Sequence, residues 1–272
     1  MNLAFLTDLA RPDGTPDDRL LVAPLLAAGV HVRFVAWDDP LADLSHIDRL
    51  VVRSPWDYYR RLEAFESFLT TVQCPTSNPL PVVRWNARKS YLTTLGNAGI
   101  PTRIHVGGSA FPWGECPWDE VVVKPEVSAG GFETFRVRRG EWPDLTTGVR
   151  YLVQPFLRDV LGEGEISFIF LGGKPSHAVR KRPVSGNFLV QEEHGGSTVR
   201  VHPTDAEWEF AAARLAELPA VIPDFGGETL LYARVDCIAG RVIELELIEP
   251  ALYLEFDPDS PARFVQGLLA LG

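Results

Sequence analysis

Two apolar strands with acids inside them restrict the fold of this chain more than any other feature. Residues 230–247 form two strand-like runs that turn near the middle of the segment. Because side chains alternate between the faces of a strand, Glu244 and Glu246 share one face, and the hairpin brings Asp236 to about the same level. Three carboxylates on one face repel each other unless a cation or a basic residue offsets them. We therefore expect an antiparallel sheet with one polar, functional face.

A bound Mg²⁺ ion is the economical explanation of this acidic face, because hard oxygen ligands suit that ion and it often bridges substrate phosphates. Asp236, Glu244 and Glu246 are thus the predicted metal ligands, with Mn²⁺ as an alternative ion. A solvated face is the other interpretation, since exposed antiparallel sheets often carry glutamate. Arg234 alternates to the same face, where it either neutralises a substrate carboxylate or pairs with one of the acids.

The N-terminal part of the chain has a different pattern, in which apolar, β-branched runs alternate with helical segments. Strands are predicted at residues 3–7, 30–36 and 49–53, and helices at residues 17–29 and 60–73. This alternation is typical of an α/β unit with a parallel sheet. A proline-rich connector, residues 74–81, marks the end of that unit.

Beyond the connector, strand-like runs follow one another closely and are joined by glycine-containing turns, which favours an antiparallel α+β arrangement. A helix is predicted at residues 87–98, after the capping residue Asn86. The further predicted strands are residues 120–124, 134–137, 151–154, 165–171 and 176–182, and the further helices are residues 204–218 and 261–271. The predicted fold class is therefore mixed α/β and α+β.

A lysine ends the strand at residues 120–124 and a loop of small residues follows it. Lys124 and the backbone N–H groups around Ser128, Gly130 and Gly131 are suited to phosphate oxygens. A plain β-turn is the alternative. Lys89, in the early helix, is by itself an ordinary solvated lysine.

Three other segments carry polar groups whose role the sequence leaves open. The strand at residues 151–154 ends at Pro155, and the segment to residue 157 either has backbone groups for a planar base or is simply a buried strand. Glu163 and Glu165 face ribose hydroxyls or water. Arg180 begins a basic, polar stretch with Asn187, which either folds over anionic groups or is a mobile hairpin loop.

The loop after the third strand is the best candidate for substrate contact, because α/β sheets present ligands at the carboxyl ends of their strands. It carries Arg53, Trp56, Asp57 and Tyr58. A packed corner is the competing interpretation of its aromatic residues.

Together these segments resemble the ATP-grasp superfamily over about residues 84–257. The acids are similar to the metal ligands of glutathione-synthetase-type members, in which an Asp is followed at the same offsets by Glu and Asn. Here Glu246 stands in the place of the Asn and adds a negative charge. Residues 53–58 and 191–196 resemble the bacterial glutathione-synthetase-like subgroup that includes D-cycloserine synthetase.

The resemblance implies a role for each candidate residue. Arg180, Lys124 and Asn187 are implied in catalysis beside the γ-phosphate and the acyl phosphate. The implied ATP-binding residues are Lys89, Lys124, Ser128, Gly130, Gly131, Gln154, Phe156, Leu157, Glu163 and Glu165, with the backbone of Phe156 and Leu157 at the adenine. The implied domains are an N-terminal α/β subdomain (1–82), a connecting helix and lid (83–157) and a C-terminal subdomain with the metal site (158–272).

The implied activity is that of an ATP-dependent carboxylate-amine ligase that acts through an acyl phosphate and releases ADP and phosphate. Two alternatives remain open: intramolecular cyclisation of an amino-acid derivative, and a non-catalytic nucleotide-binding protein. Small-molecule acid and amine substrates are the implied partners, and the resemblance also allows a homodimer.

Charge and composition restrict location and partners. The net charge of −10 and the lack of a basic block argue against duplex nucleic acid. No apolar stretch reaches the roughly twenty residues of a membrane span. Three widely spaced cysteines fit a reduced, cytoplasmic setting without a metal knuckle.

Overall fold

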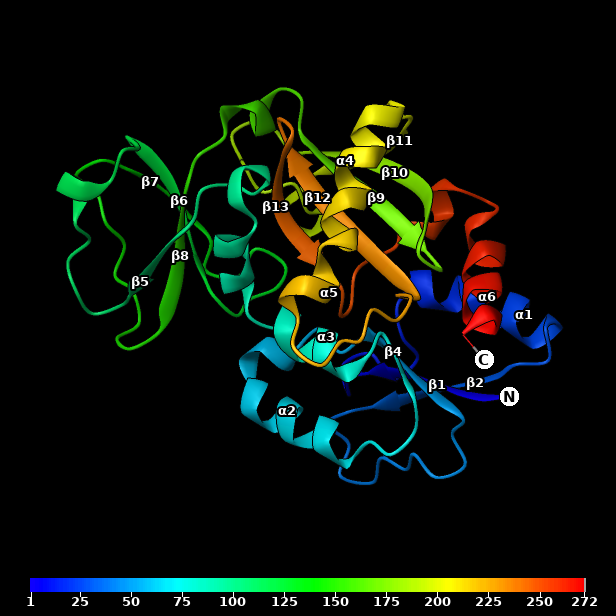
Figure 1. The fold of residues 1–272 in the computed structure, drawn as a ribbon. Coiled ribbons are helices and arrows are strands. Elements are labelled where there is room, and N and C mark those ends of the chain that lie inside the picture. The colour runs from blue at the N-terminus through cyan, green and yellow to red at the C-terminus, as the bar shows by residue number, and fades with distance from the viewer. Residues whose placement is uncertain (272) are drawn as a thin grey trace.

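The structure, a computed structural model, describes residues 1–271 and contains three β-sheets arranged around a common centre (Figure 1). The first sheet is parallel, in the strand order β2-β1-β3-β4. Its strands are β1 (Asn2–Thr7), β2 (His31–Ala36), β3 (Arg49–Ser54) and the short β4 (Thr76–Ser77). The helices α1 (Pro16–Ala27) and α2 (Leu62–Thr71) connect them, as the alternating pattern predicts.

The second sheet is antiparallel and lies at the left of Figure 1, in the order β5-β8-β6-β7. It consists of β5 (Arg103–Val106), β6 (Glu120–Pro125), β7 (Phe135–Arg138) and β8 (Arg150–Pro155). Its small core is aromatic: the rings of Phe111 and Trp142 stack with centroids 4.3 Å apart over Val121 and Val153. This sheet therefore has an apolar core of its own.

The third sheet has five antiparallel strands, in the order β11-β10-β9-β12-β13. They are β9 (Glu165–Leu171), β10 (Lys174–Arg182), β11 (Ser197–Val201), β12 (Tyr232–Ile238) and β13 (Arg241–Glu246). On one face, Trp208 of α4 (Asp205–Ala216) packs against Phe168, and α5 (Leu218–Val221) follows it. On the other face, α6 (Ser260–Ala270) places Phe264 beside Tyr232 and contacts α1. The mixed α/β and α+β class is thus confirmed.

The segment between the first two sheets differs from its prediction. The sequence predicts one helix at residues 87–98, whereas α3 (Leu80–Asn86) ends before it and two 3-10 helices follow, Lys89–Thr94 and Gly96–Ala98. Arg88 is extended, and the Lys89 N–H bonds to the Glu126 carbonyl at 2.9 Å instead of to the preceding turn. The other 3-10 helices are Tyr58–Arg60, Trp113–Glu115, Arg158–Leu161, Glu192–His194 and Leu254–Phe256.

Buried polar groups join the parallel sheet to the five-stranded sheet. The Asn78 amide donates to the carbonyls of Tyr232 (2.8 Å) and Leu247 (2.9 Å) and accepts from the Leu231 N–H (2.9 Å). These contacts fix the orientation of the two sheets, although the domain boundaries at residues 82 and 157 stay a prediction. No helix within residues 1–271 has both the length and the apolar character to cross a membrane.

Candidate active site

A cavity of about 1110 Å³ lies where the three sheets meet. Each of the three predicted domains (1–82, 83–157 and 158–272) contributes residues to the lining of this cavity. It collects these residues predicted from the sequence: Trp56, Tyr58, Lys89, Lys124, Ser128, Gly130, Gly131, Gln154, Phe156, Leu157, Glu165, Arg234, Asp236, Glu244 and Glu246. The functional face predicted from the acid-bearing hairpin is therefore the floor of the cavity.

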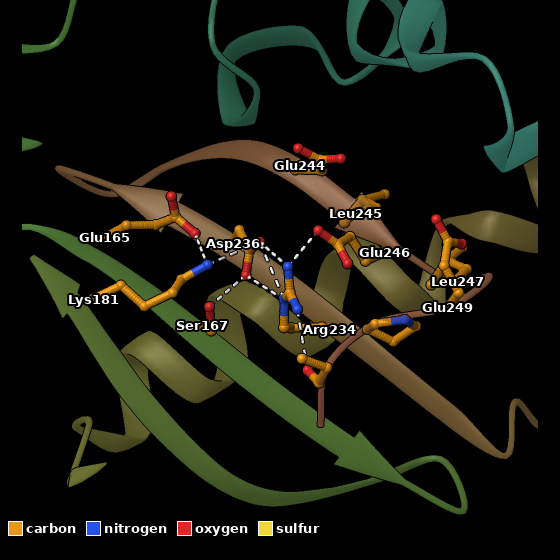
Figure 2. Close-up of polar contacts among 12 residues, drawn as sticks. Glu165, Ser167, Lys181, Arg234, Asp236, Glu244, Leu245, Glu246, Leu247 and Glu249 are labelled. Carbon is orange, nitrogen blue, oxygen red and sulfur yellow. Dashed lines mark hydrogen bonds and ion pairs between the residues drawn. The ribbon is translucent and has the colours of Figure 1, made fainter. Parts of the chain in front are cut away.

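The acids of β12 and β13 face the cavity in the register that the hairpin predicts. Asp236 pairs with Glu244 across the two strands, and Arg234 pairs with Glu246. Figure 2 shows Arg234 between Asp236 and Glu246, with its guanidinium 3.0 Å from a carboxylate oxygen of Asp236 and ion-paired with Glu246. Arg234 thus pairs with acids of this face, the second of its two predicted roles.

Glu244 faces two lysines from other parts of the chain. It forms an ion pair with Lys89, and the Lys124 ammonium lies 3.9 Å from its second oxygen. Within residues 1–271 no group of three or more His, Cys, Asp or Glu side chains is arranged to hold a metal ion. Asp236, Glu244 and Glu246 each pair with a lysine or an arginine. The metal assignment of Asp236, Glu244 and Glu246 stays a prediction.

Lys181 is a cation of the site that the sequence analysis missed. It lies on β10 directly opposite Glu165 of β9, with which it forms an ion pair, and its ammonium is 3.5 Å from Asp236 (Figure 2). Arg180, the predicted catalytic residue, lies outside the cavity and donates to the Glu163 carbonyl at 2.9 Å. Neighbouring residues of a strand face opposite sides, so Lys181 faces the cavity and Arg180 does not.

Burial and close charges shift the pKa values in this floor. Burial alone raises the pKa of Asp236, but Arg234 and Lys181 outweigh it and hold that pKa below its usual range. Burial raises the pKa of Glu165 to about 7, against the attraction of Lys181. Burial also lowers the pKa of Lys124, with Lys89 repelling its charge, while Glu244 acts in the opposite direction.

Glu249 is a second functional candidate that the sequence analysis missed, although it directly precedes Pro250. Its carboxylate lines the cavity and has no ion-pair partner among the described residues. Burial raises its pKa to about 8, and Glu246 adds to the shift. The floor thus has more acids (Glu165, Asp236, Glu244, Glu246 and Glu249) than cations (Lys89, Lys124, Lys181 and Arg234).

The loop after β6 covers one side of the cavity. Its Gly130 and Gly131 both have positive φ, at 60° and 75°, so the backbone turns in a way that favours glycine. The buried Ser128 hydroxyl donates to the Pro125 carbonyl at 3.2 Å. Phe132 of this loop lies against Tyr59, with ring centroids 5.3 Å apart. The loop therefore contacts the N-terminal part of the chain.

The segment predicted to bind adenine lies at the far wall of the cavity. Gln154 donates to the Thr102 hydroxyl at 2.9 Å. The Phe156 N–H is occupied by the Glu120 carbonyl at 2.9 Å, so a base must use other backbone groups here. Glu163 is exposed in the turn before β9 and does not line the cavity, whereas Glu165 does.

Three other predicted site residues lie outside the cavity. Arg53 is buried in the core, where it bonds to Asp18 at 2.8 Å and to the Pro250 carbonyl at 3.1 Å. Asp57 accepts from the Trp37 indole at 2.8 Å and pairs with an arginine of α2's N-terminus. The Asn187 side chain accepts from the N–H groups of the two residues that follow it. All three side chains contact other parts of the chain outside the cavity, and their predicted substrate-binding and catalytic roles stay predictions.

Sequence and structure comparisons now place the chain among known proteins. Residues 3–78 match the family model "D-cycloserine synthetase DcsG, N-terminal domain". The cycloserine biosynthesis protein DcsG of Streptomyces lavendulae is 30% identical over 299 residues, covering 98% of this chain and 97% of its own. The chain belongs to the DcsG family of ATP-grasp ligases.

Two further comparisons agree with membership of the DcsG family. The crystal structure of D-cycloserine synthetase DcsG superposes with a TM-score of 0.85 at 27% identity and covers all of both chains. A glutathione synthetase of Prochlorococcus marinus (strain MIT 9313) is 28% identical over 65% of this chain and 57% of its own. The resemblance predicted from the acid-bearing hairpin is thereby confirmed.

In this DcsG-family chain, the end of the cavity beside the parallel sheet was largely missed by the sequence analysis. Trp56 and Tyr58 were predicted there, but Arg11, Asp17 and Tyr253 also line it. The Arg11 guanidinium lies 4.9 Å from the centroid of the Trp56 ring. Arg11 follows β1, and α/β sheets bind ligands at the carboxyl ends of their strands. Its place in the sequence was therefore a signal that could have indicated a site residue.

Proposed function

We propose that this ATP-grasp ligase activates the carboxylate of a small amino-acid-like substrate and closes a ring within that substrate. The carboxylate oxygen bonds to the γ-phosphorus of ATP, and the bond to ADP breaks. A nitrogen of the same molecule then attacks the acyl carbon, and phosphate leaves with the electron pair of the broken C–O bond. The nitrogen loses a proton to solvent or a base. ADP and phosphate are the other products.

We favour ring closure over ligation of a separate amine because of how much of the chain is similar to DcsG. The similarity covers the whole chain, including the N-terminal residues that supply the Arg11, Trp56 and Tyr58 wall. A relative that shared only the nucleotide site would leave the substrate end undefined. Ligation of a separate amine is the rival reaction, because the similarity to a glutathione synthetase covers much of the same nucleotide region.

The cations of the cavity fit phosphoryl transfer, which needs charge neutralisation and positioning more than covalent catalysis. We assign Lys89, Lys124 and Lys181 to the phosphates of ATP. Each is largely buried, so its charge acts in surroundings where screening by water is weak. Asp236 and the other acids hold these lysines in the cavity when no phosphate is bound.

The acids of the hairpin fit Mg²⁺ in the chemistry of their donors. Asp236, Glu244 and Glu246 present only oxygen atoms, which is what this ion prefers, and they share the face that carries the lysines. A bound ion would supply Lewis-acid stabilisation of phosphate charge. The side chains of this chain would hold the ion and, through the Gly130 loop, exclude water from the acyl phosphate.

We assign the wall at Gln154 and Leu157 to the adenine of ATP, with Glu165 on the ribose side. The assignment is supported by the fact that Gln154, Leu157 and Glu165 all line the cavity. A cytoplasmic location and a homodimer remain part of the proposal as expectations of the family.

A substrate panel separates ring closure from ligation. Purified protein is given Mg-ATP with single D- or L-amino acids, pairs of an acid and an amine, or O-ureido-D-serine, and release of ADP and phosphate is measured. We expect O-ureido-D-serine alone to support release. A requirement for an acid together with an amine would show that the chain is a two-substrate ligase.

A further inference from the structure

The backbone of residues 252–254 is held from two sides by residues far away in the sequence. Asp17, at the start of α1, accepts the Leu252 N–H at 2.6 Å with one carboxylate oxygen and the Leu254 N–H at 2.8 Å with the other. His177, on β10, points its Nε2 at the carbonyls of Leu252 (2.9 Å) and Tyr253 (3.0 Å). Because both partners are carbonyls, Nε2 carries the proton and donates.

This clamp holds a backbone conformation that the local sequence disfavours. Tyr253 has a φ of 53°, in the left-handed region that bulky residues rarely adopt. Such a conformation persists only where the surrounding structure imposes it. Here Asp17 and His177 bond on both sides of Tyr253, and the Arg234 guanidinium bonds to the Ala251 carbonyl at 3.0 Å. The position of the Tyr253 side chain is therefore set by three separate elements.

The Tyr253 ring lies beside two cations of the cavity floor. Its centroid is 5.6 Å from the Arg234 guanidinium and 6.0 Å from the Lys181 ammonium, both within range of a cation–π contact. These cations are the partners of Asp236, and the ring itself lines the cavity. The ring is thus an aromatic part of the cavity lining next to two buried cations.

We propose that Tyr253 is a specificity-determining residue at the substrate end of the cavity, and that Asp17 and His177 are positioning residues that hold it there. The inference rests on the proposed function, since it assumes that this cavity binds a small amino-acid-like substrate. A fixed aromatic wall beside buried cations selects a compact substrate, with its charged group near the cations and a short side chain against the ring.

Substitutions at Tyr253 test the wall itself. Tyr253→Gly removes the ring at a position where glycine suits the backbone, and Tyr253→Phe keeps the ring. With O-ureido-D-serine and Mg-ATP, we expect Tyr253→Gly to raise the KM for O-ureido-D-serine about tenfold and to leave the KM for ATP within about twofold. It should also improve the relative kcat/KM for the homologue with one more methylene, since one methylene in an apolar pocket is worth about tenfold or more. Tyr253→Phe should raise the KM for O-ureido-D-serine less than Tyr253→Gly does, because the ring stays in place.

Substitutions of the clamp test the positioning roles. Asp17→Ala and His177→Ala remove the two sets of bonds, and His177→Gln restores an N–H donor. Asp257→Asn is the matched control, because Asp257 is also a buried acid that pairs with two arginines near this loop but does not line the cavity. We expect faster amide hydrogen exchange in residues 250–256 and a raised KM for O-ureido-D-serine in the two alanine variants, partial rescue in His177→Gln, and neither change in Asp257→Asn.

The two readouts separate this inference from the proposed function. Unchanged exchange in Asp17→Ala and His177→Ala would overturn the clamp whether or not the enzyme is active. In an active enzyme, an unchanged KM in Tyr253→Gly would overturn the specificity role. A wild-type protein without turnover of any panel compound would contradict the proposed function and with it the specificity role, and the exchange data would then decide the clamp alone.

Discussion

At the residue scale, the face of β10 on which a basic side chain lies decides whether it reaches the cavity. Lys181 and Arg180 are neighbours on β10, but only Lys181 faces Glu165 and Asp236. Arg180 lies on the face towards α4 and bonds to the backbone of the preceding turn. A run of basic residues in a strand is therefore ambiguous until its register is known.

Substitution of these two neighbours should give opposite results. We expect Lys181→Met to lower kcat about 100-fold or more, because a buried charge on the phosphates is lost, and Arg180→Met to change kcat less than about twofold. Steady-state ADP release measures both variants. Since Lys181→Met also leaves Glu165 and Asp236 without a partner, thermal unfolding and Mg-ATP binding must show that the variant is folded. Equal losses of activity in the two variants would contradict the assignment.

The sequence predicted the positions of residues whose partners lie nearby in the chain. It missed those whose positions depend on partners far away in the sequence. The hairpin register of Asp236 and Glu244 follows from strand alternation alone. Arg53 looked like a ligand residue because it ends a parallel strand, yet Asp18 of α1 buries it as an ion pair. Tyr253 has no local signal, since its role depends on Asp17 and His177.

At the element scale, the turn before β9 packs closely against the backbone of β10. Gly164 has a φ of 83°, and a Cβ there would lie 2.2 Å from the Lys181 carbonyl. Gly162, two residues earlier, has open space around its Cβ position and a negative φ. The two glycines therefore form a matched pair in one turn.

We expect Gly164→Ala to lower the free energy of unfolding by about 2 kcal/mol or more, since the left-handed backbone alone costs roughly 1–2 kcal/mol for an L-residue and the clash adds to it. Gly162→Ala should change it by less than about 0.5 kcal/mol. Urea denaturation measures both. Equal stability of the two variants would contradict the close approach of the Gly164 backbone to the Lys181 carbonyl.

His177 links two elements and should make stability depend on pH. Burial lowers the pKa of His177. The nearby charge of Asp257 raises that pKa and the charge of Arg263 lowers it, and burial has the largest effect. The folded state therefore holds the neutral ring, while the unfolded chain takes up a proton near pH 6.5. The contribution of His177 is fully present above that pH and is lost as the pH falls below it towards the folded pKa.

The expected result is a shallower loss of stability in His177→Gln than in the wild type as the pH falls from about 6.5. Gln keeps an N–H donor for the Leu252 and Tyr253 carbonyls but does not titrate. Chemical denaturation at a series of pH values gives the difference between the two proteins. Parallel curves would mean that the His177 ring is not held neutral.

Among the elements, strands with continuous apolar runs were predicted well and short or contact-dependent ones were not. β9 was predicted at its observed bounds, because its residues are buried on both faces. The strand β11 was missed, since it is a largely exposed edge strand of mixed composition. The helix predicted at residues 87–98 was wrong because Lys89 bonds to Glu126 of another element, which no local pattern reveals.

At the scale of the whole molecule, an acidic protein gathers buried cations in one cavity. The chain has a net charge of −10, yet Lys89, Lys124, Lys181 and Arg234 meet where the three sheets converge. The family could be predicted because the motifs that carry the resemblance follow one another along the chain. The substrate end could not, because it is assembled from α1, the loop after β3 and the loop after β13.

We infer that this cavity moves the γ-phosphate of ATP to a carboxylate, and the fate of a labelled carboxylate oxygen is the direct test of that step. O-ureido-D-serine labelled with ¹⁸O in its carboxylate is incubated with the protein and Mg-ATP, and the released phosphate is analysed by mass spectrometry. We predict one carboxylate oxygen in each phosphate, because the acyl phosphate breaks at its C–O bond. Phosphate released without label would contradict an acyl-phosphate intermediate and with it the account of the site.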